Sequence, residues 1–316
     1  MKRKMRFEVT PISVLASASS RMRIDADVVI ASSSGWAHAF PTTGRKIVYC
    51  HSPARWLYLS DDYLGEAGPL DPKRLALTAL TPLLIRWDQR SAQTADLYLA
   101  NSSVVRERVM RVYGIDALTL FPPFSPDLVE GSQRPMSSLV GWAGEDGAED
   151  GHYLVVSRLQ PYKHVDKVVQ AFEQLPDDRL LVIGKGPEGD RLRSMAPSNV
   201  RFAEGLSDAE MRWAYAKSEA LIAASHEDFG LTPLEAGAFG KPTFALRAGG
   251  YLDTVTEGVN GLFFEEAEPG QIAEAITRGR NEEFDEQRIK TNVDDCFGEE
   301  RFLAALHAEV SKVKGL

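Results

Sequence analysis

Two glutamates spaced eight residues apart are the most informative pair of side chains in the sequence. Glu227 and Glu235 lie in ASHEDFGLTPLEAGAFGKP, residues 224–242. Glu227 follows a predicted strand in a glycine-flanked loop, where a purely structural role is hard to find. Glu235 has a structural alternative, because Thr-Pro-Leu-Glu is also the pattern of a capping box with Glu at its fourth position. Both roles are compatible, since a capped helix start can also hold a ligand.

The residues between the two glutamates predict an anion site. Thr232 is expected to cap a helix whose first residue is Pro233, an arrangement that suits both residue types. Three backbone N–H groups would then face outward at the positive end of this helix, a geometry best matched to phosphate. They belong to Phe229, Gly230 and Leu231.

A pair of cations follows an earlier predicted strand. In SRLQPYKHVD, Arg158 ends the strand 153–159 and Lys163 opens the next helix. Together they would neutralise a diphosphate, Arg by its planar fork and Lys as a point charge. Two separate surface charges are the alternative. Their expected position at the same sheet edge as the two glutamates favours a shared site.

The segment LLVIGKGPEGDRL contains a glycine pattern that superficially fits a dinucleotide-binding turn. Gly184, Gly186 and Gly189 follow a predicted strand, and Glu204 lies at the distance expected of a ribose-binding acid. A tight strand-to-helix turn is the favoured interpretation, because this strand is the second of its domain and Pro187 fills the turn.

In the first half of the chain, His51 follows a buried-type strand in YCHSPARWLY. A histidine there can orient a sugar or phosphate or relay a proton, and a structural histidine is the equal alternative. Asn101 and Ser102 end another strand, where Ser102 or Ser103 as a helix N-cap explains the pattern. No cluster of Cys, His and Asp has the spacing of metal ligands, and no nucleophile is paired with a base.

The elements that position these groups alternate regularly after residue 152. Short apolar runs separated by helical patterns predict a parallel sheet covered on both faces, with ligands at the carboxyl ends of its strands. The predicted strands are 153–159, 179–184, 200–205, 219–225 and 242–246. Before residue 130 the alternation is less complete, with strands at 26–32, 45–50, 96–100 and 117–121 and helices at 72–94 and 103–113. The stretch 131–151, rich in Gly, Ser and acids, is predicted to be a flexible linker.

Two helical patterns place apolar residues on one face. The first follows the strand 153–159 and carries Val165, Val168, Val169 and Phe172. The second is the last helix of the chain, with a stripe of Phe302, Leu303, Leu306 and Val310. Both stripes are expected to be buried.

Composition excludes several classes of protein. A net charge of −9 argues against nucleic acid, which demands a basic face. The longest apolar run, 75–85, is too short to span a bilayer, and no secretory signal is visible. Two cysteines suit a reducing cytosol, so a cytoplasmic protein is expected. The basic clusters Lys2-Arg3-Lys4-Arg6 and Lys73-Arg74 are interpreted as solvated faces, with peripheral contact at the inner face of the membrane as the alternative.

Taken together, the motifs resemble the retaining group 1 (family 4) nucleotide-sugar glycosyltransferases. SRLQPYK, VIGKGPE, HEDFGLTPLEAGAFGKP and GLFF occur in the family's order and spacing. The hallmark is a pair of glutamates separated by seven residues, here Glu227 and Glu235. SSSGWAHAF, YCHSPARWLY, WDQRSAQTADLYLANSSVVRERV and FPP are similar to the bacterial mannosyltransferase-like branch that builds polysaccharides. The resemblance runs from about residue 20 to the end.

The resemblance implies a GT-B fold, an α/β architecture of two Rossmann-like domains with parallel sheets and the donor between them. It implies that Glu227 contacts the sugar hydroxyls, that Glu235 binds the donor ribose, and that His51 lies near the reacting centre. Arg158, Lys163 and the Gly230 and Leu231 amides would hold the diphosphate, so neither a metal nor another cofactor is expected. Gly184, Phe229 and Thr232 complete the expected donor-binding set.

The domains expected on this basis differ from the family at the beginning. Members usually start with a strand, a glycine-rich loop and a helix, which nothing before residue 26 supplies. We therefore expect a first domain, 1–130, that is incomplete at its N-terminus, whether truncated, remodelled or completed by a partner chain. The linker 131–151 and a donor-binding domain, 152–297, follow. The resemblance implies that a last helix, 298–316, crosses back to the first domain.

The function expected is transfer of a hexose, mannose-like, from a nucleoside-diphosphate sugar to a saccharide or lipid-linked acceptor with retention. The missing segment is expected to impair turnover more than donor binding. The alternatives are a non-catalytic sugar-nucleotide-binding subunit that needs a partner chain, a Rossmann dehydrogenase using GKGPEG, and a GT-B epimerase.

Overall fold

The computed structural model describes residues 23–58, 72–124, 126–136, 139, 142 and 151–315, with the side chains of 72–79 and 126 left out. The stub before residue 23 and its basic cluster therefore lie outside the described residues, as do the side chains of Lys73 and Arg74. The chain divides into two compact units. The first comprises Met1–Phe121 and Ala304–Leu316, and the second Pro122–Leu303.

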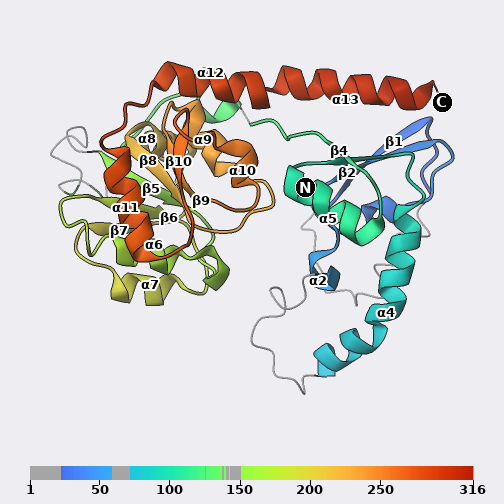
Figure 1. The fold of residues 1–316 in the computed structure, drawn as a ribbon, viewed down its shortest axis with the longest axis horizontal. Coiled ribbons are helices and arrows are strands. Elements are labelled where there is room, and N and C mark those ends of the chain that lie inside the picture. Colours follow the sequence, from blue (N-terminus) through green and yellow to red (C-terminus); the bar gives the residue numbers. More distant parts are fainter. Residues whose placement is uncertain are drawn as a thin grey trace, which may run out of the picture. The chain divides into compact units, whose positions relative to one another are not determined.

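The first unit is built on a four-stranded parallel sheet in the order β1-β2-β3-β4. Its strands are β1 (Val28–Ser33), β2 (Arg45–Cys50), β3 (Leu97–Ala100) and β4 (Leu118–Thr119). All four predicted strands of this half are confirmed, although β4 is only two residues long. The helices are α2 (Arg55–Tyr58), α4 (Pro72–Ala92) and α5 (Ser103–Tyr113), with a 3-10 turn η1 (Ala37–Ala39) (Figure 1). The small residues Ala31 and Ala100 let α5 pack Val105 and Val109 against the sheet.

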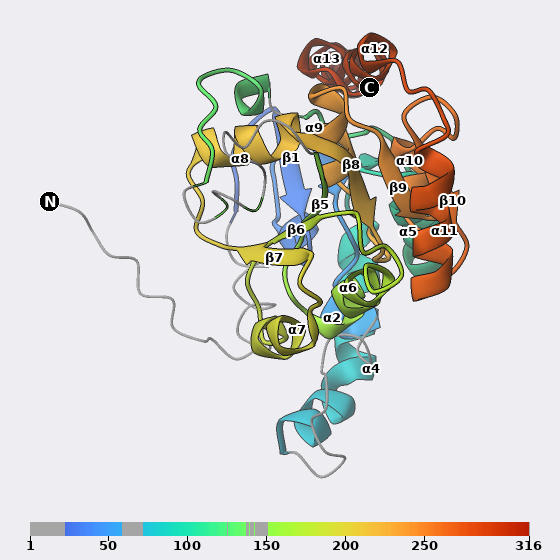
Figure 2. The ribbon, with the colours of Figure 1, turned by 90° about the vertical axis from the view of Figure 1, so that its left-hand side faces the viewer.

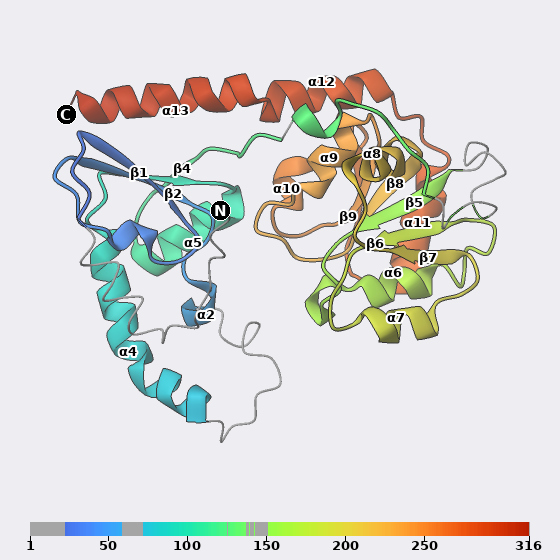
Figure 3. The same cartoon turned by 180° about the vertical axis from the view of Figure 1, so that it is seen from behind.

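The second unit is built on a six-stranded parallel sheet in the order β10-β9-β8-β5-β6-β7. Figure 3 labels β9, β8, β5, β6 and β7 of this sheet. The strands are β5 (His152–Val156), β6 (Leu180–Ile183), β7 (Val200–Ala203), β8 (Ser218–Ala223), β9 (Thr243–Leu246) and β10 (Gly261–Phe264). The five strands predicted from apolar runs are confirmed. β10 contains the short GLFF motif and was not among those five.

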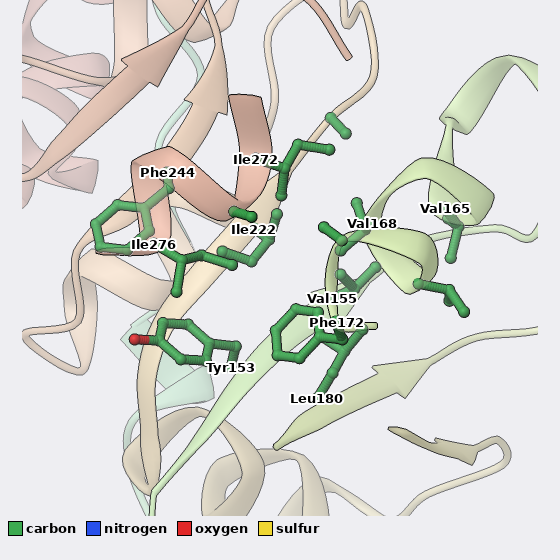
Figure 4. Close-up of a cluster of buried hydrophobic side chains, with 14 of the residues drawn as sticks. Tyr153, Val155, Val165, Val168, Phe172, Leu180, Ile222, Phe244, Ile272 and Ile276 are labelled. Atoms are coloured by element: carbon green, nitrogen blue, oxygen red, sulfur yellow. The ribbon is translucent and has the colours of Figure 1, made fainter. Parts of the chain in front are cut away.

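Helices cover both faces of this second sheet (Figure 2). They are α6 (Val165–Ala171), α7 (Gly189–Met195), α8 (Asp208–Ala216), α9 (Thr232–Ala238), α10 (Tyr251–Thr254), α11 (Pro269–Gly279) and α12 (Glu286–Phe297), with 3-10 turns η2 (Pro126–Leu128) and η4 (Pro161–Lys163). On one face, Tyr153 and Val155 of β5 pack against α6 and α11 (Figure 4). On the other face, Leu154 packs against α8 and α9. Successive side chains of β5 thus pack on opposite faces of the sheet, because side chains alternate along a strand.

The segment predicted to be a flexible linker, 131–151, is partly built into the second unit. Met136 and Leu139 are buried in the cluster that contains Leu154 and Trp213. The backbone N–H of Arg134 also donates to the Ala209 carbonyl at 3.0 Å. Two buried apolar residues thus attach this segment to the second unit, although its sequence shows no periodic hydrophobic pattern.

The last helix, α13 (Glu299–Lys314), begins in the second unit, and its residues from Ala304 onward cluster with the first. The stripe predicted to be buried on it is wrong in part. Leu303 is 42% exposed, whereas Val313, outside that stripe, is buried.

Candidate donor-binding site

The sheet order explains how distant residues reach one place. β5 and β8 are neighbouring parallel strands, so the segments that follow them leave the same edge of the sheet. The loop 157–164 after β5 carries Arg158 and Lys163. The loop 224–231 after β8 carries Glu227 and leads into α9 with Glu235.

Lys163 and Glu227 contact each other directly. The ammonium of Lys163 donates to Glu227 Oε1, and the Ser225 hydroxyl donates to the same oxygen at 2.7 Å. The Lys163 side chain is only 8% exposed, so its charge is held where solvent screens it little. Among the described residues, no side chain or backbone group donates to the other oxygen, Glu227 Oε2.

Arg158 lies on the exposed side of this pair. Its guanidinium donates to the Tyr162 hydroxyl at 2.9 Å, and the Tyr162 ring lies 5.2 Å from Lys163 Nζ. The predicted pair of cations therefore shares one aromatic neighbour. Lys163 is the buried member and Arg158 the exposed one.

The turn between the glutamates depends on glycine. Gly230 has φ +84°, and a Cβ there would lie 2.7 Å from the buried Tyr251 ring. The Tyr251 hydroxyl lies 3.2 Å from Ser225 Oγ, so the turn and the Glu227 carboxylate are braced by one side chain. Across the part of the chain that the structure describes, the N–H groups of Gly230 and Leu231 have no protein acceptor. Phe229 is buried, with its ring 5.9 Å from that of Phe297.

The predicted capping box at α9 is wrong. The helix begins at Thr232 rather than Pro233, the preceding Leu231 is already in the α region, and no side chain caps the end. Glu235 instead accepts a hydrogen bond from the Tyr215 hydroxyl of α8. Burial raises the pKa of Glu235, and the Tyr215 hydrogen bond acts in the opposite direction. The Glu235 carboxylate is thus hydrogen-bonded to a residue of α8 rather than capping its own helix.

The glycine pattern at 184–189 packs loop against loop. A Cβ at Gly184 would lie 1.8 Å from the Ser157 carbonyl oxygen, and one at Gly186 would lie 2.2 Å from that of Leu159. Gly184 thereby holds β6 close to the loop that carries Lys163. The following helix α7 is only seven residues long, and Glu204 faces Arg193 at 4.0 Å. This agrees with the tight-turn interpretation rather than with a dinucleotide fingerprint.

His51 occupies the carboxyl edge of the first sheet. Its Nε2 lies 2.8 Å from Ser32 Oγ at the end of β1, and its ring packs edge-on to Tyr49 with centroids 5.0 Å apart. Burial lowers its pKa, so the neutral ring is favoured. At the neighbouring β3, Ser102 accepts from the Val105 N–H at 3.1 Å and is the N-cap of α5, as predicted.

Three site residues were missed from the sequence: Ser225, Tyr251 and Tyr215. Ser225 lies two residues before Glu227, a signal that was available. The two tyrosines have no spacing that relates them to the glutamates, and only the packing of α8 and α10 brings them there.

Within the described residues, no group of three or more His, Cys, Asp or Glu side chains is arranged to hold a metal ion. None of the described helices combines the length and the apolar character needed to cross a membrane.

Comparison with solved structures defines the class to which the fold belongs. Solved structures that share the fold include the Anabaena protein HepE in complex with UDP (TM-score 0.67, 17% identity, 95% of this chain and 81% of that one). Sucrose-phosphate synthase from Thermosynechococcus elongatus gives a TM-score of 0.66 at 18% identity, over 91% of this chain and 73% of that one. A glycosyltransferase from Rickettsia africae gives a TM-score of 0.61 at 16% identity, over 92% of this chain and 98% of that one. The architecture is therefore the predicted α/β GT-B type, with two Rossmann-like units.

Sequence comparison supports the group 1 glycosyltransferase resemblance in the second unit. Residues 146–294 match the family model described as glycosyl transferases group 1. The D-inositol 3-phosphate glycosyltransferases of Mycobacterium tuberculosis and Mycobacterium bovis are 27% identical to this chain over 211 residues, 62% of its length. That alignment spans 43% of those relatives, less than half of their length.

Proposed function

We propose that this chain is a retaining glycosyltransferase that moves a hexose, mannose-like, from a nucleoside-diphosphate sugar to a saccharide or lipid-linked acceptor. The observation that carries the proposal is the contact of Lys163 with Glu227 beside the Gly230 turn, at the carboxyl edge of a parallel sheet. A buried cation, the carboxylate that contacts it and two available N–H groups, with Glu235 in the helix that follows, suit a ligand that joins phosphates to hydroxyl-bearing rings. The UDP bound by HepE and the matched family support the same class of donor.

The proposed donor contacts follow from the chemistry of each group. The diphosphate is held by Lys163 and Arg158 and by the Gly230 and Leu231 N–H groups, while Glu235 accepts from the ribose hydroxyls. Glu227 accepts from the hydroxyls of the sugar. Gly184, Phe229 and Thr232 shape the surrounding walls.

The Lys163–Glu227 pair implies an exchange when donor binds. A diphosphate has more charge and more acceptor oxygens than one carboxylate, so it competes for Lys163 Nζ. Glu227 Oε1 then becomes an acceptor for a sugar hydroxyl. Each group exchanges one hydrogen-bond partner for another, so neither is left without a hydrogen bond.

In the proposed reaction, cations and backbone N–H groups stabilise the charge that develops on the leaving diphosphate. Retention follows if a diphosphate oxygen takes the proton of the acceptor hydroxyl, which attacks the anomeric carbon on the face that the diphosphate leaves. His51 is assigned a role near the reacting centre from the family resemblance.

Calorimetric titration of UDP and GDP tests the donor site. We expect one of the two to bind, and Lys163→Ala to weaken that binding at least about 30-fold through loss of a charge-assisted contact. The matched control is Lys167→Ala, because Lys167 pairs with the exposed Glu268 at 3.1 Å and is expected to leave affinity unchanged. No heat for either nucleotide with the unaltered chain, or equal affinity in the Lys163 variant, would overturn the proposal.

A transfer assay separates the proposal from its closest rival. With nucleoside-diphosphate hexoses and a panel of saccharide and lipid-linked acceptors, the isolated chain is expected to form a product whose anomeric configuration matches the donor. Tight donor binding without transfer would favour a sugar-nucleotide-binding subunit that needs a partner chain. Conversion of the donor without an acceptor would favour an epimerase.

A further inference from the structure

Tyr215 is among the largest fully buried side chains of the protein, yet it ends in a polar group. It lies in the last turn of α8, and its ring stacks on Phe239, just after α9, with centroids 5.6 Å apart and planes 5° from parallel. Its hydroxyl donates to Glu235 Oε2. A stacked ring that cannot turn gives this hydroxyl one fixed direction.

The Glu235 carboxylate accepts one hydrogen bond from the described residues. Within the described residues, Oε2 accepts from Tyr215 and Oε1 has no protein partner. The partly buried Glu210 in the same unit accepts two hydrogen bonds at its Oε2, from the N–H and the hydroxyl of Ser207. A largely buried carboxylate usually has its oxygens hydrogen-bonded, so the free oxygen of Glu235 is the one available to a ligand.

We propose that Tyr215 is a positioning residue for sugar recognition: it holds Glu235 Oε2 so that Oε1 accepts from the vicinal hydroxyls of the donor ribose. The inference deepens the proposed function and rests on it. A glutamate alone has three rotatable bonds, and a carboxylate free to turn loses the preference for one hydroxyl position. The Tyr215 hydroxyl restricts rotation of the Glu235 carboxylate by holding Oε2, and in this proposal it does not contact the ligand. Tyr215 thereby makes the site select ribonucleotides over deoxyribonucleotides.

Tyr215→Phe tests the inference, because it removes one oxygen and keeps the ring stacked on Phe239. Calorimetry would compare UDP with its 2′-deoxy and 3′-deoxy forms, or the guanosine set if GDP is the better ligand. The unaltered chain is expected to prefer the ribonucleotide about tenfold, the range of a hydrogen bond to a charged group. In Tyr215→Phe this preference is expected to fall to about twofold, with the affinity for the deoxy forms unchanged.

The matched control is Tyr153→Phe, another buried tyrosine of the same unit. It lies near the start of β5, away from the carboxyl edge of the sheet. This variant is expected to retain the full ribose preference. Phe239→Leu is a second route to the same effect, since it loosens the Tyr215 ring while keeping both polar groups, and an intermediate preference is expected.

The outcomes are distinct. If Tyr215→Phe weakens ribonucleotide and deoxyribonucleotide equally, Tyr215 has a structural role only and the inference fails. An unchanged preference in both Tyr215→Phe and Phe239→Leu also overturns it. If the unaltered chain binds no nucleoside diphosphate, the proposed function fails first and the inference falls with it. In a Glu235→Gln background, Tyr215→Phe is expected to have no further effect on the preference.

Discussion

The two units place their charged side chains in opposite ways. In the first unit, His38, Lys46, Asp88 and Arg108 are all buried within the fold. Asp88 accepts from the hydroxyls of Tyr58 and Tyr113 at 2.7 and 2.9 Å, and the His38 ring lies 3.0 Å from its other oxygen. In the second unit, the clusters around β5 are apolar apart from the buried His152, and Lys163, Glu227 and Glu235 follow the ends of its strands.

This difference distinguishes charged groups that stabilise the fold from charged groups that are available to a ligand. The Asp88 cluster is occupied by its own neighbours, with Lys46 bonded to the His38 carbonyl at 2.9 Å and to Thr94 at 2.8 Å. Such a buried network stabilises one packing arrangement, because its charged groups bond mainly to neighbours within the fold. At the edge of the second sheet, Lys163 and Glu227 are paired with each other. Some carboxylate oxygens and N–H groups there still have no hydrogen-bond partner among the described residues. Charge at that edge is expected to matter for binding more than for folding.

The strongest test of this contrast is Asp88→Ala. It leaves the buried Tyr113, the partly buried Tyr58 and His38 without their acceptor, so the free energy of unfolding is expected to fall by about 3 kcal/mol. Nucleotide affinity is expected to stay unchanged. Urea unfolding and hydrogen exchange resolved by segment would place the loss in β2 and α4. Asp116→Ala, which breaks an exposed pair with Arg106, is the control and is expected to cost less than about 0.5 kcal/mol. Similar losses for the two variants would remove the distinction between internally paired and exposed charge.

A pH test concerns His152, the buried histidine of the second unit, whose Nε2 lies 3.0 Å from the Ala214 carbonyl. Burial lowers its pKa from 6.5 to about 4. The unfolded chain therefore binds more protons between these values, and the stability contributed by neutral His152 is present above pH 6.5 and lost as the pH falls towards 4. Between pH 7 and pH 5 the unaltered chain is expected to lose about 2 kcal/mol more than His152→Gln, which stays uncharged. Parallel pH dependences in the two proteins would contradict the prediction.

The smallest expected difference compares two glycines of positive φ, one in each unit. Gly114 ends α5 at φ +67° with nothing within 4 Å of the position that a Cβ would take, whereas a Cβ at Gly230 would meet the Tyr251 ring. Alanine at Gly114 is expected to cost about 1 kcal/mol for its backbone alone, and at Gly230 about 1 kcal/mol more for the contact. Only Gly230→Ala is expected to weaken nucleotide binding. Thermal unfolding measures the loss of stability, and calorimetry measures the change in nucleotide affinity. Equal losses of stability in the two variants would contradict the prediction, because they would mean that the Tyr251 ring moves aside without an energetic cost.

Much of the fold followed from local patterns. Val165, Val168, Val169 and Phe172 were expected on one face, and all are buried against the second sheet. Apolar runs such as LLVI have the length of buried parallel strands and were found as β6. The burial of Met136 and Leu139 within 131–151 was not predicted, because two apolar residues are too few to show a period.

The candidate site was only partly accessible to the same reasoning. The residue types and their position after strands identified Lys163, Glu227, Gly230 and Glu235. The capping box at α9 failed because it is a local pattern, and a tertiary contact with Tyr215 competes for the same carboxylate. Sequence spacing carries no information about such a competitor.

Features that depend on neighbours along the chain could therefore be predicted from local patterns: the strands, the helical faces and the tight glycine turns. The tertiary structure alone decided the partners. Lys163 meets Glu227 across 64 residues and Tyr215 meets Glu235 across 20. The physical reason is the strand order, which sets β8 beside β5 although β6 and β7 come between them in the chain. That order follows from how all the layers pack together, so no short segment contains it.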